Sequence, residues 1–123
     1  MKRRLGGVCV ILLVGVLLSG AITQEHFNAR TGKDLLVLCT PDEKDPLSQA
    51  AINFCIGFAV GTYRTLLDMT KLNPVVCLPE NAPSRNEAIQ MFVAWAQQNP
   101  QYHKDAPEDM LTRFIVQQWP CPK

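Results

Sequence analysis

Cysteine offers the most chemistry in this sequence of 123 residues, which contains five of them. Cys9 lies in an apolar start, and Cys39, Cys55, Cys77 and Cys121 follow at separations of 16, 22 and 44 residues. No two form a C-x-x-C pair and no histidine stands at zinc-ligand spacing, so the pattern predicts no metal site. An even number of cysteines in a small exported domain is instead typical of disulfide bonds. The four later cysteines therefore predict two disulfides.

Export is indicated by the start of the chain. Positive residues at positions 2–4 precede an uncharged run over 5–18, and Ser19 and Ala21 stand at the −3 and −1 positions of a cleavage site. The run of about 14 residues is shorter than the roughly 20 that cross a bilayer, although an uncleaved anchor is the alternative. We expect a signal peptide over residues 1–21, placed to within two or three residues, and a periplasmic domain over 22–123 with no membrane anchor.

Other reactive groups are sparse. His26 and His103 are the two histidines, the residue type that most often acts as a base in catalysis, and no serine has the glycine-flanked setting of a hydrolase nucleophile. Gly57 and Gly61 lack the lysine and the strand of a phosphate-binding loop. The net charge is +1, or −2 once the signal peptide leaves 9 Lys and Arg against 11 Asp and Glu, which gives no basic surface for nucleic acid. The sequence predicts a protein that is not an enzyme and needs no cofactor.

Helix punctuation recurs along the domain, whereas strand alternation is almost absent. Side chains that cap helix N-termini stand before apolar-periodic segments. Ser84 with Glu87, and Asp105 with Glu108, have the spacing of capping boxes, and Pro46 suits a first helical position. Proline-containing pairs stop the segments. These signals predict four helices, which begin after Thr31, Asp45, Ser84 and Asp105 and end before Thr40-Pro41, Asn73-Pro74, Asn99-Pro100 and Trp119-Pro120.

Apolar residues at helical spacing define the faces that these helices should bury. The expected core residues are Leu47, Ala51, Phe54, Phe58, Leu66 and Met69 in the second helix, Ile89, Phe92, Val93 and Ala96 in the third, and Met110, Leu111, Phe114 and Ile115 in the fourth. Gly57 and Gly61 each cost roughly 1 kcal/mol against alanine, which suggests close packing of a neighbouring backbone or a tolerated defect. The fold class is all-α, a small four-helix bundle stapled by two disulfides.

The bundle topology restricts how the cysteines pair. If the second, third and fourth helices run antiparallel in turn, Cys77 and Cys121 lie at the same pole. Cys39 comes from the other pole, and Cys55 lies two to three turns inside the second helix, within reach of a first helix folded back across it. The expected pairs are Cys39 with Cys55 and Cys77 with Cys121, while a Cys55 to Cys77 bridge is the alternative.

Four short motifs occur in a fairly specific order and spacing: Phe54-Cys55-x-Gly57-Phe58-x-x-Gly61, Cys77-Leu78-Pro79, Asn99-Pro100-x-Tyr102-His103 and Trp119-Pro120-Cys121-Pro122. Through them the sequence resembles the Rap/Tai group of periplasmic immunity proteins over about residues 32–122, with Trp119 where many relatives have phenylalanine. The resemblance implies a helical inhibitor of a peptidoglycan amidase delivered by type VI secretion. It also implies a homodimer, for which Met91 and Trp95 are candidate contacts; the alternative is that both complete the core.

The loop over 99–105 is the expected inhibitory surface. It is bracketed by prolines, and its Tyr102 offers an aromatic anchor, with Gln101, His103 and Lys104 beside it as polar contacts. The alternative for this loop is a solvated connector whose tyrosine packs on the bundle. The alternative function is a cell-envelope helical binding module or stress chaperone with no toxin partner, a class that the fold alone does not separate from an inhibitor.

Overall fold

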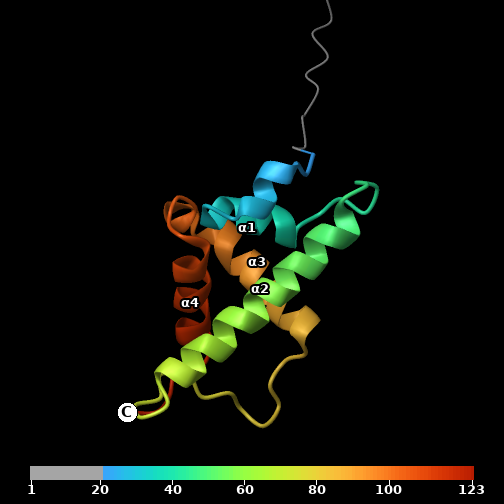
Figure 1. The fold of residues 1–123 in the computed structure, drawn as a ribbon. Coiled ribbons are helices and arrows are strands. Elements are labelled where there is room, and N and C mark those ends of the chain that lie inside the picture. Colours follow the sequence, from blue (N-terminus) through green and yellow to red (C-terminus); the bar gives the residue numbers. More distant parts are fainter. Residues whose placement is uncertain (1–20) are drawn as a thin grey trace, which may run out of the picture.

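The computed structural model describes residues 21–123 (Figure 1), so the expected signal peptide and Cys9 lie outside the described residues, apart from Ala21. No β-strand occurs in the described part, where a single bridge joins Val76 and Pro120. The all-α, four-helix prediction is confirmed. Two short 3-10 helices accompany the α-helices, in the order η1 (Gln24–Asn28), α1 (Gly32–Cys39), α2 (Ser48–Met69), α3 (Arg85–Gln98), η2 (Pro100–Tyr102) and α4 (Pro107–Gln118).

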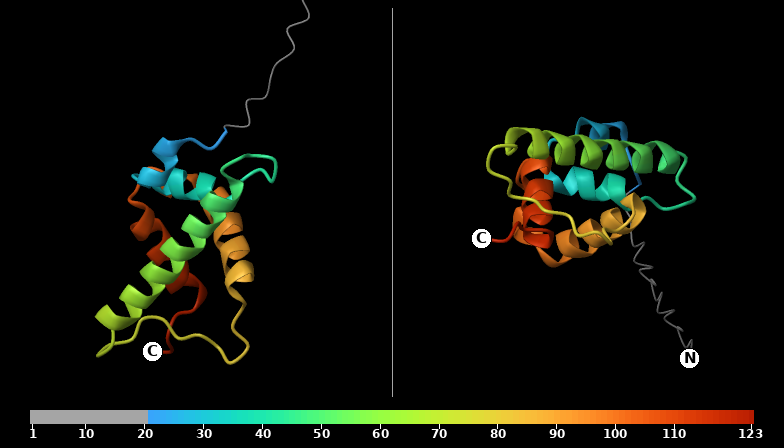
Figure 2. Two further views of the ribbon diagram at one scale, coloured as in Figure 1. Left: turned by 45° about the vertical axis from the view of Figure 1, so that its right-hand side comes forward. Right: turned by 90° about the horizontal axis from the view of Figure 1, so that it is seen from below.

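The short helix α1 is the centre of the packing. It contacts each of the other three α-helices. Seen from below, α1 lies between the long α2 and the pair formed by α3 and α4 (Figure 2). One pole of the molecule carries η1, α1 and the connector from α3 to α4. The opposite pole carries the end of α2 and the C-terminus (Figure 1).

All four α-helices contribute to one main core. Its largest fully buried side chains include Leu35 of α1, Phe92 of α3 and Met110 and Phe114 of α4, and the rings of Phe92 and Phe114 meet edge to face with centroids 5.5 Å apart. A smaller cluster around Ile22, Leu38 and Ala51 lies under η1 and the start of α2. The buried positions expected for α4 are all confirmed.

Both disulfides have the predicted pairing. Cys39 of α1 is bonded to Cys55 of α2, with their Cα atoms 5.2 Å apart, and Cys77 is bonded to Cys121, with Cα atoms 4.8 Å apart. The second bond sits beside main-chain pairing in which the Cys77 amide donates to the Trp119 carbonyl at 2.8 Å. The first disulfide thus links α1 to α2, and the second links the segment after α2 to the segment after α4.

Two helix starts have reciprocal caps: the one at α3 is the predicted capping box, whereas at α1 only Thr31 as the N-cap was predicted. At α1 the Thr31 hydroxyl accepts from the Asp34 amide at 3.2 Å, and the Asp34 carboxylate accepts from the Thr31 amide at 3.0 Å. At α3 the Ser84 hydroxyl and Glu87 carboxylate make the same exchange, at 3.3 and 2.7 Å. The hydrogen bonds from the Ser84 side chain and amide hold the pKa of Glu87 below its ordinary value.

The α2 helix starts later than predicted. It begins at Ser48 because residues 45–47 form a turn, in which the Ser48 amide donates to the Asp45 carbonyl at 2.9 Å. The Asp45 carboxylate accepts from the Leu47 amide at 2.8 Å and from the Ile22 amide at 2.9 Å. These two main-chain donors hold the pKa of Asp45 below its ordinary value. Asp45 therefore shapes the entry to α2 and fastens the start of the domain to it.

The capping box expected at α4 is wrong. Its N-cap is Ala106, with no side-chain hydrogen bond, and Pro107 occupies the first helical position. Asp105 is engaged differently, because its main-chain carbonyl accepts from the Gly32 amide of α1 at 2.8 Å. Tertiary contact thus replaces the local cap that the spacing of Asp105 and Glu108 predicts.

Two expectations for α2 are also wrong. A methyl group added at Gly57 or Gly61 would meet no atom of another described segment within 4 Å, and both glycines are exposed, so no other helix of residues 21–123 packs its backbone against them. Met69 is 80% exposed and lies outside the core. By length and mean hydropathy, 1.3 over 18 residues, α2 resembles a membrane-spanning helix, but it packs against α1, α3 and α4 in this domain.

Candidate functional site

The connector over residues 99–105, which leads from α3 toward α4, is hydrogen-bonded to the start of α1. The first amides of an α-helix have no partner within the helix. Here the Gly32 amide donates to the Asp105 carbonyl and the Lys33 amide to the His103 carbonyl, both at 2.8 Å. The connector therefore caps α1 with its own main chain, and α1 fixes the shape of the connector in return.

Gly32 allows this close approach. A Cβ at this position would lie 2.6 Å from Sδ of the buried Met110 and 3.1 Å from the Tyr102 carbonyl oxygen. Both distances are tighter than ordinary van der Waals contact. A residue without a side chain is therefore needed where the connector crosses α1.

Tyr102 is held at the edge of the core. Its ring stacks on Trp95 of α3, with centroids 5.7 Å apart and planes 7° from parallel. The guanidinium carbon of Arg113 lies over the Tyr102 ring, 4.4 Å from its centroid, a cation-π geometry. The ring is half-buried, so Tyr102 packs on the bundle and still presents part of its surface.

His103 is anchored through one ring nitrogen. Its Nε2 lies 2.8 Å from the Ala96 carbonyl oxygen in the last turn of α3. A carbonyl only accepts, so Nε2 carries the hydrogen and donates it. Nδ1 is the other ring nitrogen, and in this tautomer it is an acceptor.

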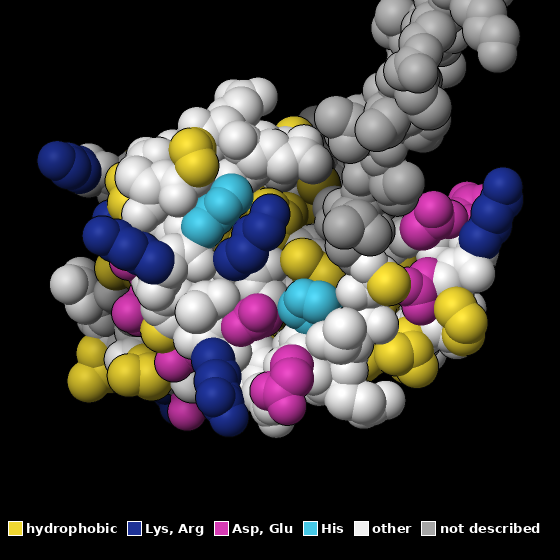
Figure 3. Space-filling model, turned by 90° about the horizontal axis from the view of Figure 1, so that it is seen from above, with side chains coloured by type: hydrophobic (Ala, Val, Ile, Leu, Met, Phe, Trp, Pro, Cys, Tyr) yellow, Lys and Arg dark blue, Asp and Glu magenta, His cyan; other side chains and the backbone are white. Residues whose placement is uncertain are grey.

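Gln101 and Lys104 are the exposed members of the expected contact set. Gln101 donates from Nε2 to the side-chain oxygen of Asn99 at 3.1 Å, which leaves its own oxygen facing solvent. Seen from above, both histidines of the chain lie on the same face of the molecule, among basic and acidic side chains (Figure 3). The structure therefore places the four residues in one connector but divides them into two anchored and two exposed side chains.

The two candidate dimer contacts pack within their own chain. Trp95 is half-buried, and its indole N–H donates to the Gln117 side-chain oxygen at 3.0 Å. Met91 is half-buried against the main core. Both side chains keep a part of their surface exposed.

Residues 31–121 match the family of Rap1a immunity proteins. The chain belongs to this family. The matched segment runs from the N-cap of α1 to Cys121, so it includes all four α-helices, both disulfides and the connector described above. No curated protein and no solved structure matches the chain.

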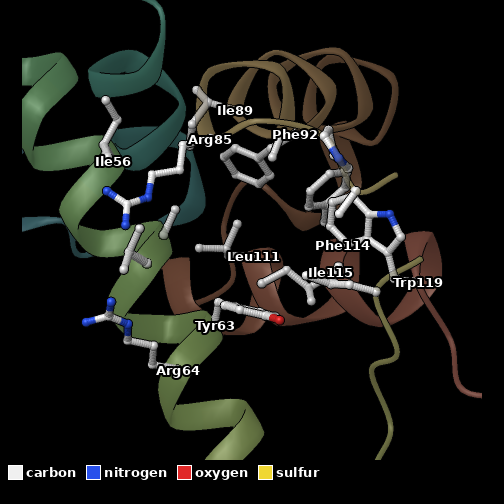
Figure 4. Close-up of a pocket in the computed structure, with 16 residues that line it drawn as sticks. Ile56, Tyr63, Arg64, Arg85, Ile89, Phe92, Leu111, Phe114, Ile115 and Trp119 are labelled. Carbon is white, nitrogen blue, oxygen red and sulfur yellow. The ribbon is translucent and has the colours of Figure 1, made fainter. Parts of the chain in front are cut away.

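A second candidate site of this immunity protein is an apolar pocket of about 260 Å³ between α2, α3, α4 and the segment before α3 (Figure 4). Its floor consists of buried core side chains: Ile89, Phe92, Leu111, Phe114 and Ile115. Its rim carries four exposed residues: Arg64, Leu78, Ala82 and Arg85. Tyr63 and Trp119 are the other lining residues with a polar side-chain atom, and no carboxylate from residues 21–123 lines the pocket.

Sequence reasoning did not find Gly32, Arg113 or the two rim arginines. A glycine at the first position of a capped helix is unusual enough to suggest a special role for Gly32. Its partners could not be predicted, because they lie on α4 and on the connector. Arg113 meets Tyr102 only because α4 folds back beside α3. Within residues 21–123, no three His, Cys, Asp or Glu side chains are placed to hold a metal ion.

Proposed function

We propose that this chain is a periplasmic immunity protein of a type VI secretion system and that it inhibits a peptidoglycan amidase effector. Membership of the Rap1a immunity family supports a toxin as the partner. Two disulfides fit an oxidising compartment, and the apolar start of the sequence fits export to the periplasm. The protein acts by binding and not by chemistry.

The inhibitory surface that we propose is the connector over 99–105. The observation that carries it is the pair of 2.8 Å hydrogen bonds from the Gly32 and Lys33 amides, which set the shape of the connector before any partner arrives. A preformed loop loses less conformational entropy on docking than a mobile one, and this favours tight binding. The stacking of Tyr102 on Trp95 has the same effect on the aromatic anchor.

Each side chain has a distinct part in this proposal. Lys104 and Gln101 reach the amidase first, because they are exposed. Lys104 offers a donor to a carboxylate of the cleft, and Nδ1 of His103 accepts from a donor there. Tyr102 contributes contact area at little entropic cost, as rigid aromatic anchors do.

The test uses the amidase encoded beside this gene, if the neighbouring reading frame encodes one with a catalytic cysteine and histidine. We expect Gln101→Ala/Lys104→Ala to weaken binding by at least about 2 kcal/mol, the threshold of a hot spot. The matched control is Gln49→Ala/Lys44→Ala, which removes the same side-chain types from an exposed region elsewhere. Calorimetry measures both, and equal affinities for the two variants would refute the proposed surface.

One observation favours the alternative of an envelope binding module or stress chaperone. The exposed large apolar side chains of the described residues fall in a single stretch, at Leu67, Met69, Leu72 and Leu78. Exposed side chains of this kind, where they gather in one patch, are typical of protein contact sites. A light-scattering assay with a denatured client distinguishes this role, because an inhibitor specific for one amidase leaves client aggregation unchanged.

The proposed homodimer uses Met91 and Trp95, whose partly exposed surfaces lie on α3. Sedimentation of the wild-type chain and of Met91→Ala measures the association. A dimer that persists unchanged in the variant would place the contact on another helix.

A further inference from the structure

We propose that the apolar pocket beside α2 binds a small anionic amphiphile: a single unbranched alkyl or acyl chain that ends in a carboxylate or phosphate. This site is distinct from the connector over 99–105, and the inference does not depend on the proposed toxin. Figure 4 shows the two arginine side chains on the α2 side of the pocket, away from the aromatic rings of Phe92 and Phe114.

The floor of the pocket favours an apolar ligand. Phe92, Leu111 and Phe114 are each at most 2% exposed and form the floor, so the pocket reaches the main core. Aromatic and aliphatic side chains of this kind line most small-molecule sites. A polar group placed against them would lose its hydrogen bonds to water without replacement. The buried end of the ligand is therefore a hydrocarbon.

The rim favours a negative charge. Arg64 of α2 and Arg85 of α3 are both exposed at the opening, and none of the described residues that line the pocket is acidic. A guanidinium presents several N–H donors in a planar fork that matches the oxygens of a carboxylate or phosphate. Two such groups above an apolar floor are complementary to a molecule with a hydrocarbon end and an anionic end.

The volume of the pocket favours an alkyl chain over a single aromatic side chain as the ligand. A cavity of roughly 150 Å³ is enough to hold benzene. A phenylalanine side chain from a protein partner would thus fill little more than half of the 260 Å³ available. A methylene group occupies about the volume of a water molecule, roughly 30 Å³, so the cavity has room for a chain of about eight to ten carbons.

The experiment titrates the folded, oxidised protein with decanoate, followed by calorimetry and by amide chemical shifts. We expect saturable binding of one decanoate, with shifts concentrated at residues 56–64 and 111–119. Decylammonium has the same chain with the opposite charge, and butyrate has the same head with a short chain. Both should bind at least about tenfold more weakly, because one loses the charge-assisted hydrogen bonds and the other the apolar contact.

Two variants separate the head-group site from the chain site. Arg64→Gln/Arg85→Gln should weaken decanoate at least about tenfold and leave decylammonium binding no weaker than before. Ala59→Leu adds a side chain that projects into the pocket and should abolish decanoate binding in a protein that remains folded. The matched control Arg30→Gln/Lys44→Gln removes two positive charges outside the pocket and should leave the decanoate affinity unchanged.

Several results would overturn the proposal. They are the absence of saturable decanoate binding, equal affinity for decanoate and decylammonium, or a decanoate affinity that neither variant changes. Binding to phosphatidylglycerol vesicles without binding of monomeric decanoate would mean adsorption to a membrane surface instead. Stronger binding by the dipeptide N-acetyl-Asp-Phe-amide than by decanoate would assign the pocket to a protein partner.

Discussion

His103 donates from Nε2 to the main-chain carbonyl of Ala96 at 2.8 Å, at the point where α3 stops. In a continuing helix that carbonyl would accept from the amide of residue 100. Residue 100 is proline and has no amide hydrogen. The histidine ring thus stands where the amide of residue 100 would donate, and it shares the Ala96 carbonyl with the Asn99 amide, which donates at 3.2 Å. The end of α3 is joined to the connector by a side chain of the connector itself.

The first prediction follows from this bond. We expect His103→Ala to lower the free energy of unfolding by about 0.5 to 1.5 kcal/mol, because the Ala96 carbonyl loses one of its two donors and keeps the Asn99 amide, at 3.2 Å. Lys104→Ala, the neighbouring exposed substitution, should change it by no more than about 0.5 kcal/mol. Urea denaturation of both variants measures the difference. Equal stabilities would show that the hydrogen bond contributes nothing to the fold.

The second prediction contrasts two glycines. Gly32→Ala should destabilise the protein by about 1 to 3 kcal/mol, since its Cβ would overlap Met110 and crowd the Tyr102 carbonyl. Gly57→Ala should stabilise it by up to about 1 kcal/mol, because this exposed helical position has free space and alanine is the better helix former. Thermal denaturation of the two variants measures whether each is less or more stable than the wild-type protein. A stabilised Gly32→Ala variant would contradict the close approach of α1 and the connector.

The third prediction concerns the disulfides. The Cys77 to Cys121 bond closes the longer loop and is the more exposed, whereas Cys39 and Cys55 are both buried. Cys77→Ser/Cys121→Ser should therefore lower the unfolding free energy by roughly 2 to 5 kcal/mol. A mild reductant should open this bond first, because a thiolate must reach the sulfur that it attacks. Alkylation followed by mass spectrometry of Cys39 and Cys77 peptides decides the order.

The fourth prediction concerns acid. Hydrogen bonds hold the pKa values of Asp45 and Glu87 below their ordinary range in the folded protein. The folded state then binds protons less readily than the unfolded state, so the carboxylates stabilise the fold above the unfolded pKa of about 4. That contribution is lost as the pH falls through the folded values, and we expect stability to drop between about pH 5 and pH 3. Asp45→Asn/Glu87→Gln should flatten the dependence, measured by denaturation at each pH.

The sequence correctly predicted helix caps whose donor and acceptor lie within a few residues of each other. Thr31 caps its helix and Ser84 with Glu87 forms a capping box, both as predicted, because each cap is complete within four residues. Asp105 has the same type of spacing to Glu108, yet its helix is entered differently, because a distant helix takes its carbonyl. The spacing of Asp105 and Glu108 alone does not show that the Gly32 amide of α1 binds the Asp105 carbonyl.

Contacts between distant segments explain the remaining differences. The disulfide pairing was predictable because the helix order already fixes which cysteines share a pole. The layer of Trp95, Tyr102 and Arg113 was not, since it depends on how α4 lies beside α3. Gly57 is an exposed helical glycine in the structure, and a sequence does not tell an exposed glycine from one under close packing.

The bond between the Ile22 amide and Asp45, 2.9 Å long, has a consequence for maturation. If the signal peptide is cut after Ala21, as its small residues predict, the Ile22 nitrogen becomes the α-ammonium of the mature chain. A neutral amide donor beside a carboxylate is then replaced by a full positive charge. Removal of the leader would thus turn this hydrogen bond into an ion pair at the entry to α2, so that cleavage would strengthen the attachment of the mature N-terminus to the folded domain.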